Sequence, residues 1–219
     1  RQGRLPVNKK YRDLDLHPIS RDMFLAIACD SCGGIGLKPL DYVRALPQVV
    51  ARLTSRVVLM EVLSSGAILA ALTAAICCEP SPTGEALLEG IRQSMAEAGC
   101  SDIPLTISTE KNIPTEQTAL GMTAIGMLEN KTLEARRSWP GCLIFAAGVP
   151  KVGQELAEGF DLAVAAGGKL NLSLDITTPI DLHKSAGTCT TLLFTSAQDT
   201  LDLTQFNVPC YAVGTIEHL

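Results

Sequence analysis

The chain has 219 residues, of which 47% are hydrophobic and 19% charged, so it is long enough for one large or two small globular domains. A net charge of −5 without a basic stripe argues against nucleic acid or an anionic membrane surface as the main partner, and favours a small molecule. Aromatic residues make up only 4% of the chain, so we expect a core built from Ala, Val, Leu and Ile.

The first strand is expected at the apolar run Met23–Ala28. Because the chain begins at Arg1 and not at a methionine, we treat residues 1–8 as a trimmed or appended end and leave them out of the fold prediction. The segment Lys9–Pro18 is polar with a few apolar positions, which predicts an extended arm that leads into the strand.

A glycine-rich segment, Cys29–Asp41, follows this strand. Its glycines, Gly33, Gly34 and Gly36, allow positive φ angles and let the backbone approach a ligand closely. Pro39 suits the first position of a helix, where its missing N–H costs little. The segment therefore predicts the end of a strand, a glycine turn and the start of a helix.

Charged side chains bracket the glycine turn: Asp30 and Asp41 carry carboxylates and Lys38 carries an ammonium group. Such a loop can present backbone N–H groups to a phosphate, and carboxylates with a nearby cation suit magnesium and a nucleotide polyphosphate. The spacing completes neither the Walker pattern nor Gly-x-Gly-x-x-Gly. The sequence therefore leaves two alternatives open, a phosphate-binding loop and a turn with a purely structural role.

The eight cysteines are too few for a disulfide scaffold in a chain of this length, and most lie in apolar runs, where a reduced thiol behaves as a small hydrophobic group. With no signal-peptide pattern ahead of them, they predict a reducing, cytoplasmic compartment. Cys29 and Cys32 form a Cys-x-x-Cys pair, which is typical of a redox centre or of half a zinc site. No second pair completes a zinc site and the three histidines are scattered, which favours structural thiols.

The next three elements are predicted from their apolar patterns. Leu40–Arg56 has apolar residues at helical spacing, and we expect Pro47 to break or kink this helix. Val57–Leu63 is predicted as a strand and Ser64–Cys78 as a buried helix that is too short to span a membrane. Glu61 would share a strand face with apolar residues, so it is either a surface-facing or salt-bridged residue of an edge strand or a magnesium ligand.

A helix over Pro82–Gly99 and strands at Ile103–Lys111 and Gln117–Met127 complete the first half of the chain. Glu110 and Lys111 would lie at the mouth of the first of these strands, a place where metal and substrate sites are often found. The first half therefore predicts a mixed α/β order without the strict alternation of a doubly wound sheet.

A polar segment, Asn130–Pro140, predicts a linker to a smaller second lobe. In chain order, that lobe is predicted to hold a strand at Cys142–Gly148, a short helix at Pro150–Ala157, and strands at Cys189–Thr195 and Val208–Ile216. Neither half contains an internal repeat.

Three segments stand where one protein superfamily carries its motifs. Asp30–Lys38 is similar to an Asp-Gly-Val-Gly-Thr-Lys loop, Met60–Glu61 falls at an Asn-Asp magnesium position, and Ser108–Lys111 falls at a Gly-Gly-Glu/Asp-Thr loop. Two later segments, Pro140–Phe145 and Val208–Gly214, also look alike. In these features the chain resembles the aminoimidazole ribonucleotide (AIR) synthase superfamily, also called PurM-like, which includes thiamine-monophosphate kinase, selenophosphate synthetase and the hydrogenase maturation factor HypE.

The resemblance implies an α/β (α+β) fold with two domains. Residues 9–137 would form a PurM-like N-terminal domain with a four-stranded sheet and flanking helices, and residues 138–219 an abbreviated α/β C-terminal domain. It also implies a homodimer that forms through the N-terminal domain, with ATP between the subunits and Mg²⁺ as the metal.

The resemblance further implies roles for particular residues. The metal ligands or their supports would be Asp30, Asp41, Glu61 and Glu110. The nucleotide phosphates would meet the backbone of Gly33, Gly34 and Gly36 and the charges of Lys38 or Lys111. Asp30 would orient the acceptor hydroxyl and Lys38 would act on the transferred group, so these two are the expected catalytic residues.

Within the superfamily, the short length and the glycine segment look most like the AIR synthase-related proteins assigned as α-ribazole kinase. That resemblance implies ATP-dependent phosphorylation of α-ribazole to α-ribazole 5′-phosphate in cobalamin salvage. The chain also departs from the family pattern, because Ser108 and Thr109 replace glycines and the Asn-Asp pair is reduced to one acid. Two alternatives therefore stand beside the kinase: an ATP-dependent ligase like AIR synthase, and a non-catalytic nucleotide-binding protein.

Overall fold

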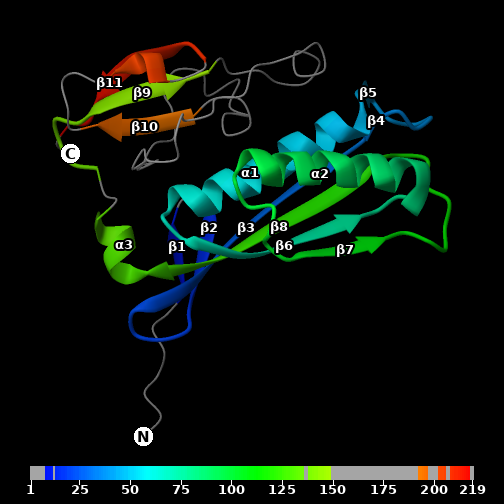
Figure 1. Ribbon diagram of the computed structural model, residues 1–219, viewed down its shortest axis with the longest axis horizontal. Coiled ribbons are helices and arrows are strands. Elements are labelled where there is room, and N and C mark those ends of the chain that lie inside the picture. Colours follow the sequence, from blue (N-terminus) through cyan, green and yellow to red (C-terminus); the bar gives the residue numbers. More distant parts are fainter. Residues whose placement is uncertain are drawn as a thin grey trace, which may run out of the picture. The chain divides into compact units, whose positions relative to one another are not determined.

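The computed structural model describes residues 8–11, 13–135, 138–148, 192–196, 202–205 and 208–217 (Figure 1). The chain divides into two compact units, residues 1–132 and 133–219, and each unit has its own sheet. This division falls a few residues before the boundary between residues 137 and 138 that the sequence predicts for the two domains.

The first unit is built on a six-stranded sheet with the strand order β1-β2-β3-β8-β6-β7. The β6–β7 pair is parallel and the other neighbouring pairs are antiparallel. The sheet has six strands where four were expected, because the predicted arm folds back as two strands beside β3. In chain order the strands are β1 (Lys9–Tyr11), β2 (Leu14–Pro18), β3 (Met23–Gly33), β6 (Ile68–Ile76), β7 (Leu105–Thr109) and β8 (Ala119–Glu129).

The two long central strands, β3 and β8, pair antiparallel along their whole length. Burial alternates along the first part of β3, where Phe24, Ala26 and Ala28 are buried and the residues between them are partly exposed. This period of two is expected of a strand that is covered on one face. The predicted strand at Met23–Ala28 is confirmed, and it continues to Gly33 through the start of the glycine segment.

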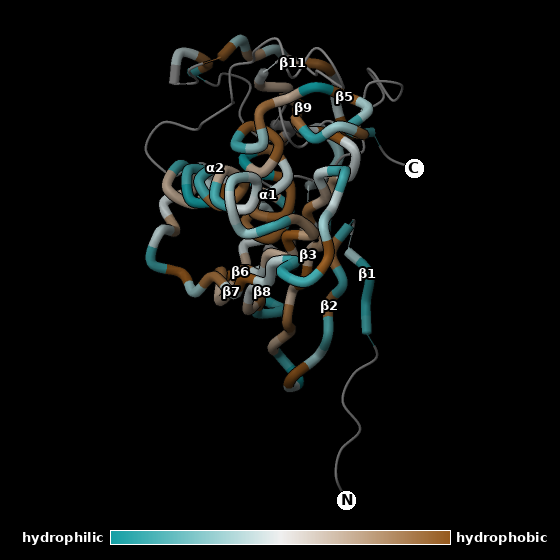
Figure 2. Tube along the Cα trace, turned by 90° about the vertical axis from the view of Figure 1, so that its right-hand side faces the viewer, coloured by the Kyte–Doolittle hydropathy of each residue, from teal (hydrophilic) through white to brown (hydrophobic). Residues whose placement is uncertain are grey.

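Helices α1 (Pro47–Ser64) and α2 (Glu85–Glu97) pack on each other and lie on the same side of the sheet (Figure 1, Figure 2). A short turn of helix, η1 (Pro80–Gly84), leads into α2. At the contact between the helices, a Cβ on Gly90 would lie 2.0 Å from the Gln48 carbonyl oxygen, so only glycine permits this approach. The buried residues of α1 follow a helical repeat and include Val50, Ala51, Val58, Leu59 and Val62.

The opposite face of this sheet is apolar, and within the described part of the first unit no helix lies on it. Ile68 on β6 is 77% exposed and Met127 on β8 is 40% exposed. Leu25, Ile27 and Ile125 on β3 and β8 are partly exposed on the same face. The sheet therefore has one face buried under the helices and one open apolar face.

Between residues 57 and 78, the structure has a helix where a strand was predicted and a strand where a helix was predicted. The strand predicted at Val57–Leu63 is wrong, because this run is the second half of α1 and its buried residues repeat at helical spacing. The helix predicted at Ser64–Cys78 is also wrong, because most of this run forms β6. Pairing with β7 and β8 overrides the helix propensity of the alanines in β6, as tertiary contacts often do.

Neither proline near the glycine turn acts as predicted. Pro47 does not break a helix but is the first residue of α1, where a missing N–H costs little. Pro39 does not begin a helix, because residues 37–40 form bends and turns. Two short parallel strands, β4 (Ile35–Gly36) and β5 (Val43–Arg44), then close the segment into a loop. We call residues 34–45 the glycine loop.

The remaining predictions for the first half are confirmed. Helix α2 lies within the predicted helical segment, and Gly99, with φ of 67°, follows its end in the left-handed conformation that favours glycine. Strands β7 and β8 lie where the sequence placed them. The segment predicted as a linker contains a short helix, α3 (Asn130–Ala135).

The second unit contains a three-stranded antiparallel sheet with the order β10-β9-β11. Its strands are β9 (Leu143–Ala147), β10 (Leu192–Ser196) and β11 (Cys210–Thr215), which confirms the three strands predicted for this lobe, and a single 3₁₀ turn, η2 (Leu203–Gln205), precedes β11. The rings of Phe145 and Phe194 stack at a centroid distance of 5.3 Å. The helix predicted at Pro150–Ala157 lies outside the described residues. Among the helices that the structure describes, none is long and apolar enough to cross a membrane.

Candidate functional site

The glycine loop is folded tightly against the start of β8. Gly34 has a φ of 71°, and its backbone N–H donates a hydrogen bond of 2.8 Å to the Thr118 carbonyl oxygen. A Cβ on Gly36 would lie 2.2 Å from Thr118 Oγ1, so this glycine is required by close packing. The Gly34 carbonyl oxygen in turn accepts a hydrogen bond of 2.7 Å from the N–H of Tyr42. The loop thus has one defined conformation.

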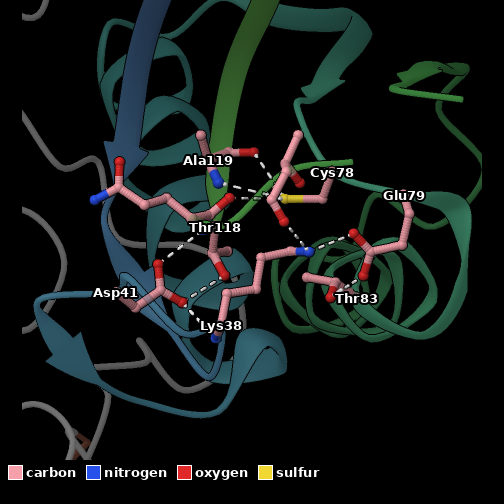
Figure 3. Close-up of polar contacts among 9 residues, drawn as sticks. Lys38, Asp41, Cys78, Glu79, Thr83, Thr118 and Ala119 are labelled. Carbon is pink, nitrogen blue, oxygen red and sulfur yellow. Dashed lines mark hydrogen bonds and ion pairs between the residues drawn. The ribbon is translucent and has the colours of Figure 1, made fainter. Parts of the chain in front are cut away.

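Asp41 is buried, and both of its carboxylate oxygens accept hydrogen bonds from the protein. Its Oδ1 accepts from the Thr118 N–H at 2.7 Å. Its Oδ2 accepts from Thr118 Oγ1 and from the Lys38 N–H, both at 2.8 Å (Figure 3). This carboxylate therefore joins two parts of the glycine loop to β8, and three protein donors already satisfy it.

Lys38 also has its partners within the protein. Its Nζ lies 2.5 Å from Glu79 Oε2 and 2.9 Å from the Thr115 carbonyl oxygen, and its side chain is only 13% exposed (Figure 3). Thr83 donates a hydrogen bond to the other oxygen of Glu79. Partial burial opposes ionisation of Glu79, but the hydrogen bonds from Lys38 and Thr83, together with the Lys38 charge, lower its pKa to about 2. Lys38 thus joins the glycine loop to the segment that follows β6.

Cys78 lies at the centre of these contacts, beside the end of β6. Its Sγ accepts a hydrogen bond of 3.4 Å from the Ala119 N–H, and the thiol lies 3.8 Å from the Gln117 carbonyl oxygen (Figure 3). Burial raises the pKa of this thiol. Cys78 is therefore a neutral packing residue, as the sequence predicts for cysteines in apolar runs. We call Lys38, Asp41, Glu79, Thr83 and Thr118 the loop network.

A second group of charged residues lies on the first unit, and no cation balances it in the described contacts. Asp30 lies on β3, Glu61 on α1, and Asp13 just before β2. Burial, and then the charges of Asp13 and Asp30, raise the pKa of Glu61 to about 7. Burial also raises the pKa of Asp30, although a hydrogen bond from the Ser31 backbone opposes this. We call Asp13, Asp30 and Glu61 the acidic trio.

The structure therefore separates the site residues predicted from the sequence into different groups. Asp30 and Glu61 act on each other electrostatically, and Asp13, which the sequence analysis missed, joins them. Asp41 and Lys38 belong instead to the loop network. Its members Glu79 and Thr83 were also missed, because they lie far from Lys38 in the sequence and no motif marks them.

Glu110 and Lys111 follow β7, as expected. The Glu110 carboxylate, however, is bound by the backbone of the turn that follows it. Glu110 Oε1 accepts hydrogen bonds from the N–H groups of Asn112 at 2.7 Å and Ile113 at 3.3 Å. Its backbone N–H donates to the Cys78 carbonyl oxygen at 3.0 Å, which places it next to the loop network. Lys111 is exposed.

The Cys-x-x-Cys pair lies on a strand, so its two side chains point to opposite faces of the sheet. Cys29 is exposed and accepts a hydrogen bond of 3.5 Å from Thr123 Oγ1. The pKa of the Cys32 thiol is raised by burial and by the charges of Asp30 and Asp41, against a hydrogen bond with Thr54. Opposite faces do not suit a disulfide or a shared zinc ion, which favours the interpretation of both as structural thiols.

Magnesium in nucleotide sites is commonly held by one or two carboxylates together with phosphate oxygens and water. Among the residues that the structure describes, no group of three or more His, Cys, Asp or Glu side chains is placed to hold a metal ion by itself. Asp30 and Glu61 fit a site with two carboxylates, phosphate oxygens and water, because they are oxygen donors whose mutual repulsion a cation would relieve. Asp41 fits less well, because binding a metal would require it to leave donors in the loop network.

Comparisons with known proteins identify the fold. No protein-family model matches the sequence, and no curated protein is significantly similar to it. Among solved structures, phosphoribosylformylglycinamidine synthase II (PurL) from Thermotoga maritima is similar, with a TM-score of 0.52 and 14% identity over 94% of this chain and 37% of that one. The same protein complexed with AMPPCP gives the same values.

Thiamine monophosphate kinase from Aquifex aeolicus is also similar, at 16% identity over 64% of this chain and 45% of that one, with a TM-score of 0.43. The chain thus spans little more than a third of the length of PurL. Sequence identity at this level shows the fold alone. The chain therefore shares the mixed α/β, PurM-like fold of PurL, which is the fold that its glycine segment and its second-half strands led us to expect.

Proposed function

We propose that this protein binds ATP with magnesium and transfers a phosphoryl group to a hydroxyl of a nucleoside-like small molecule. The single observation that carries the proposal is the acidic trio: burial and the charges of Asp13, in the turn before β2, and Asp30, on β3, raise the pKa of Glu61 on α1, and no protein cation balances these charges among the described contacts. PurL, which has the same fold, was solved with AMPPCP and with ADP, and this supports a nucleotide as the ligand.

The chemistry of phosphoryl transfer suits such a site. Catalysis depends mainly on positioning the reactants and neutralising phosphate charge, and needs little covalent chemistry from the protein. Asp30 and Glu61 would hold the magnesium ion, which when bound bridges phosphate oxygens and neutralises developing charge. Asp30 would also orient the acceptor hydroxyl, and the glycine loop would present its backbone to the phosphates. Lys111, which is exposed, is better placed than the paired Lys38 to meet a phosphate.

The specific reaction that we propose is phosphorylation of α-ribazole to α-ribazole 5′-phosphate, a step of cobalamin salvage. The support for this acceptor is the sequence resemblance of the glycine segment to the proteins assigned to that activity. The experiment is to incubate the protein with ATP, magnesium and α-ribazole and to follow the mass of the acceptor. A phosphate-sized gain in the wild type that is lost in Asp30→Asn and Glu61→Gln would support the proposal.

A matched control keeps that experiment specific. Asp22→Asn changes an exposed carboxylate on the same unit, outside the acidic trio, so this variant should keep the wild-type rate. If all three variants lose the same fraction of activity, the trio is not the site. If no acceptor gains mass and ATP does not raise the melting temperature, the proposed function is wrong.

The likeness to a synthase favours a second candidate function, an ATP-dependent ligase. PurL, with a TM-score of 0.52 to this chain, is a synthase. A ligase of this kind would release inorganic phosphate and leave none on the organic product. Phosphate release with an unphosphorylated product would therefore decide for the ligase. ATP binding without turnover of any acceptor would decide for a non-catalytic nucleotide-binding protein.

The oligomeric state is also a proposal. The open face of the sheet, with Ile68 77% exposed, carries enough apolar surface to favour pairing with a second copy of the chain. A homodimer through this face would bring two acidic trios into one assembly and agrees with the dimer that the sequence resemblance implies. Sedimentation equilibrium of the wild type and of Ile68→Asp tests this, because a charge on this face should shift the mass to that of a monomer.

A further inference from the structure

We propose that Glu79 is a positioning residue that holds the glycine loop in its binding conformation through Lys38. The role of Glu79 in nucleotide binding rests on the proposed function, whereas its role in holding the glycine loop does not. Nothing in the sequence motifs points to Glu79, which lies 41 residues from Lys38 and follows a different strand. The proposal also changes the expected role of Lys38 from a phosphate-contacting group to a structural one.

Apolar burial does little to hold the glycine loop. Three of its large apolar side chains point to solvent: Leu37 is 48% exposed, Leu40 57% and Tyr42 93%. Burial of apolar surface is the usual source of stability for a segment, and here it is largely missing. The position of the loop is therefore set mainly by polar contacts.

The polar contacts of the glycine loop converge on Lys38. Its backbone N–H donates to Asp41 within the loop, and its Nζ reaches across to Glu79 and to the Thr115 carbonyl oxygen (Figure 3). Glu79 is in turn held by Thr83, near the end of η1, the turn that leads into α2. The ion pair thus connects the glycine loop to the segment that leads into α2.

Loss of Glu79 affects Lys38 directly. The Lys38 side chain is 13% exposed and that of Glu79 32%, so the lysine is largely removed from water and the glutamate only partly. Removing one partner of such a pair leaves a poorly solvated charge that has to move to find water. Lys38 can reach water only if the loop moves, whereas the β3–β8 ladder and α1 do not depend on this contact. The effect should therefore be local.

The experiment is amide hydrogen exchange on the full chain, with Glu79→Gln beside a matched control, Glu97→Gln. Glu97 forms an ion pair of 2.6 Å with Arg52 between the two helices, and both side chains are about a quarter exposed (26% and 24%). In Glu79→Gln, the amides of residues 34–45 should exchange about 10- to 100-fold faster than in the wild type, because opening of the loop becomes easier. In Glu97→Gln the same amides should be unchanged.

Two outcomes would overturn the proposal. One is an unchanged exchange rate of these amides in Glu79→Gln. The other is an equal acceleration in both variants, which would indicate a general loss of stability. A double variant adds a third test: Lys38→Met with Glu79→Gln should exchange no faster than Lys38→Met alone, because Glu79 acts on the loop only through Lys38. Accelerations that multiply would show that the residues hold the loop independently.

Nucleotide binding supplies the functional readout. If the loop binds phosphates, Glu79→Gln should weaken the apparent affinity for magnesium–ATP by about 10-fold or more, since fewer molecules hold the competent loop, while Glu97→Gln should not. An equal affinity in Glu79→Gln and wild type, despite faster loop exchange, would overturn a positioning role in binding. Absence of ATP binding by the wild type would overturn the proposed function instead, and the exchange data would still decide whether Glu79 holds the loop.

Discussion

Two groups of charged residues in the first unit have opposite electrostatic environments. In the loop network, Lys38 and hydrogen-bond donors surround the carboxylates, and the pKa of Glu79 falls to about 2. In the acidic trio, Glu61 and Asp30 are partly buried, and burial together with the charges of Asp13 and Asp30 raises the pKa of Glu61 to about 7. The two groups lie within one small domain, so the difference arises from local partners.

This difference separates structural charges from charges that are available to a ligand. A carboxylate with three protein donors, as in Asp41, has already been compensated and stabilises the fold. A carboxylate whose pKa is raised by burial and by neighbouring charges, as in Glu61, carries an energetic cost, and such groups cluster at functional sites. The sequence alone did not make this separation, since it assigned Asp41 and Glu61 the same role.

The largest expected effect comes from removing a compensated carboxylate. Asp41→Ala leaves the N–H groups of Thr118 and Lys38 and the Thr118 hydroxyl without their acceptor in a buried place. We expect the free energy of unfolding to fall by about 3 kcal/mol, the usual cost of several unsatisfied buried donors. Urea denaturation measures this loss.

Removing a carboxylate of the acidic trio should not lower the free energy of unfolding in this way. Asp13→Ala removes a charge that repels Glu61, so its free energy of unfolding should lie within about 0.5 kcal/mol of the wild type or above it. Equal losses in Asp13→Ala and Asp41→Ala would contradict the distinction between the two groups.

The pH dependence of Glu61 gives the next largest effect. Because its pKa is about 7 in the folded state and 4.5 in the reference state, folding binds a proton between these values. Wild-type stability should therefore fall as pH rises from 4.5 to 7, and Glu61→Gln should abolish this fall. At pH 8 we expect the variant to be more stable by about 1 kcal/mol, a value reduced for the half-exposed position of the side chain.

The measurement is thermal or urea unfolding of both proteins at pH 4 and pH 8. At pH 4 the carboxyl is protonated in both states, so the two proteins should be equally stable there. A Gln variant that is less stable than the wild type at pH 8 would mean that Glu61 has a cation partner, and the trio would then be an ordinary ion-pair site.

Binding of magnesium should offset the electrostatic repulsion within the acidic trio. At pH 8 the ion neutralises the acidic trio, so we expect saturating magnesium to raise the melting temperature of the wild type by about 2–4 °C. Glu61→Gln should lose most of this shift, and lowering the pH to 5 should also reduce it, because protons then compete for the carboxylates. Differential scanning fluorimetry measures both comparisons, and a shift that persists in Glu61→Gln would place magnesium elsewhere.

Elements with a clear local sequence pattern were predictable, whereas elements that depend on pairing with distant segments were not. Strands β3 and β8 were predictable from apolar composition, and α2 from its amphipathic spacing and the glycine at its end. The second half of α1 was missed, because Val57–Leu63 is rich in β-branched residues and only the repeat continuing from Pro47 shows a helix. The alanines of β6 favour a helix until β7 and β8 pair with them.

The candidate site was predictable only in part for the same reason. Asp30 and Glu61 belong to segments that resemble family motifs, so the sequence could single them out. Asp13 and Glu79 lie in no motif, and their importance arises from contacts between distant segments, 41 residues apart for Glu79 and Lys38. One sequence contains no signal for such pairs.

The smallest expected effect distinguishes Gly34, in the glycine loop, from Gly33, the last residue of β3. Gly34 has a positive φ of 71°, so Gly34→Ala should cost about 1 kcal/mol of unfolding free energy through backbone strain. A Cβ on Gly33 meets nothing within 4 Å and its φ is not positive, so Gly33→Ala should change stability by less than about 0.5 kcal/mol. Gly33 is therefore the one position where a loss of ATP affinity without a loss of stability would reveal close approach of a ligand to the backbone. Equal affinity in Gly33→Ala and wild type, measured by titration calorimetry, would instead assign this glycine no part in binding.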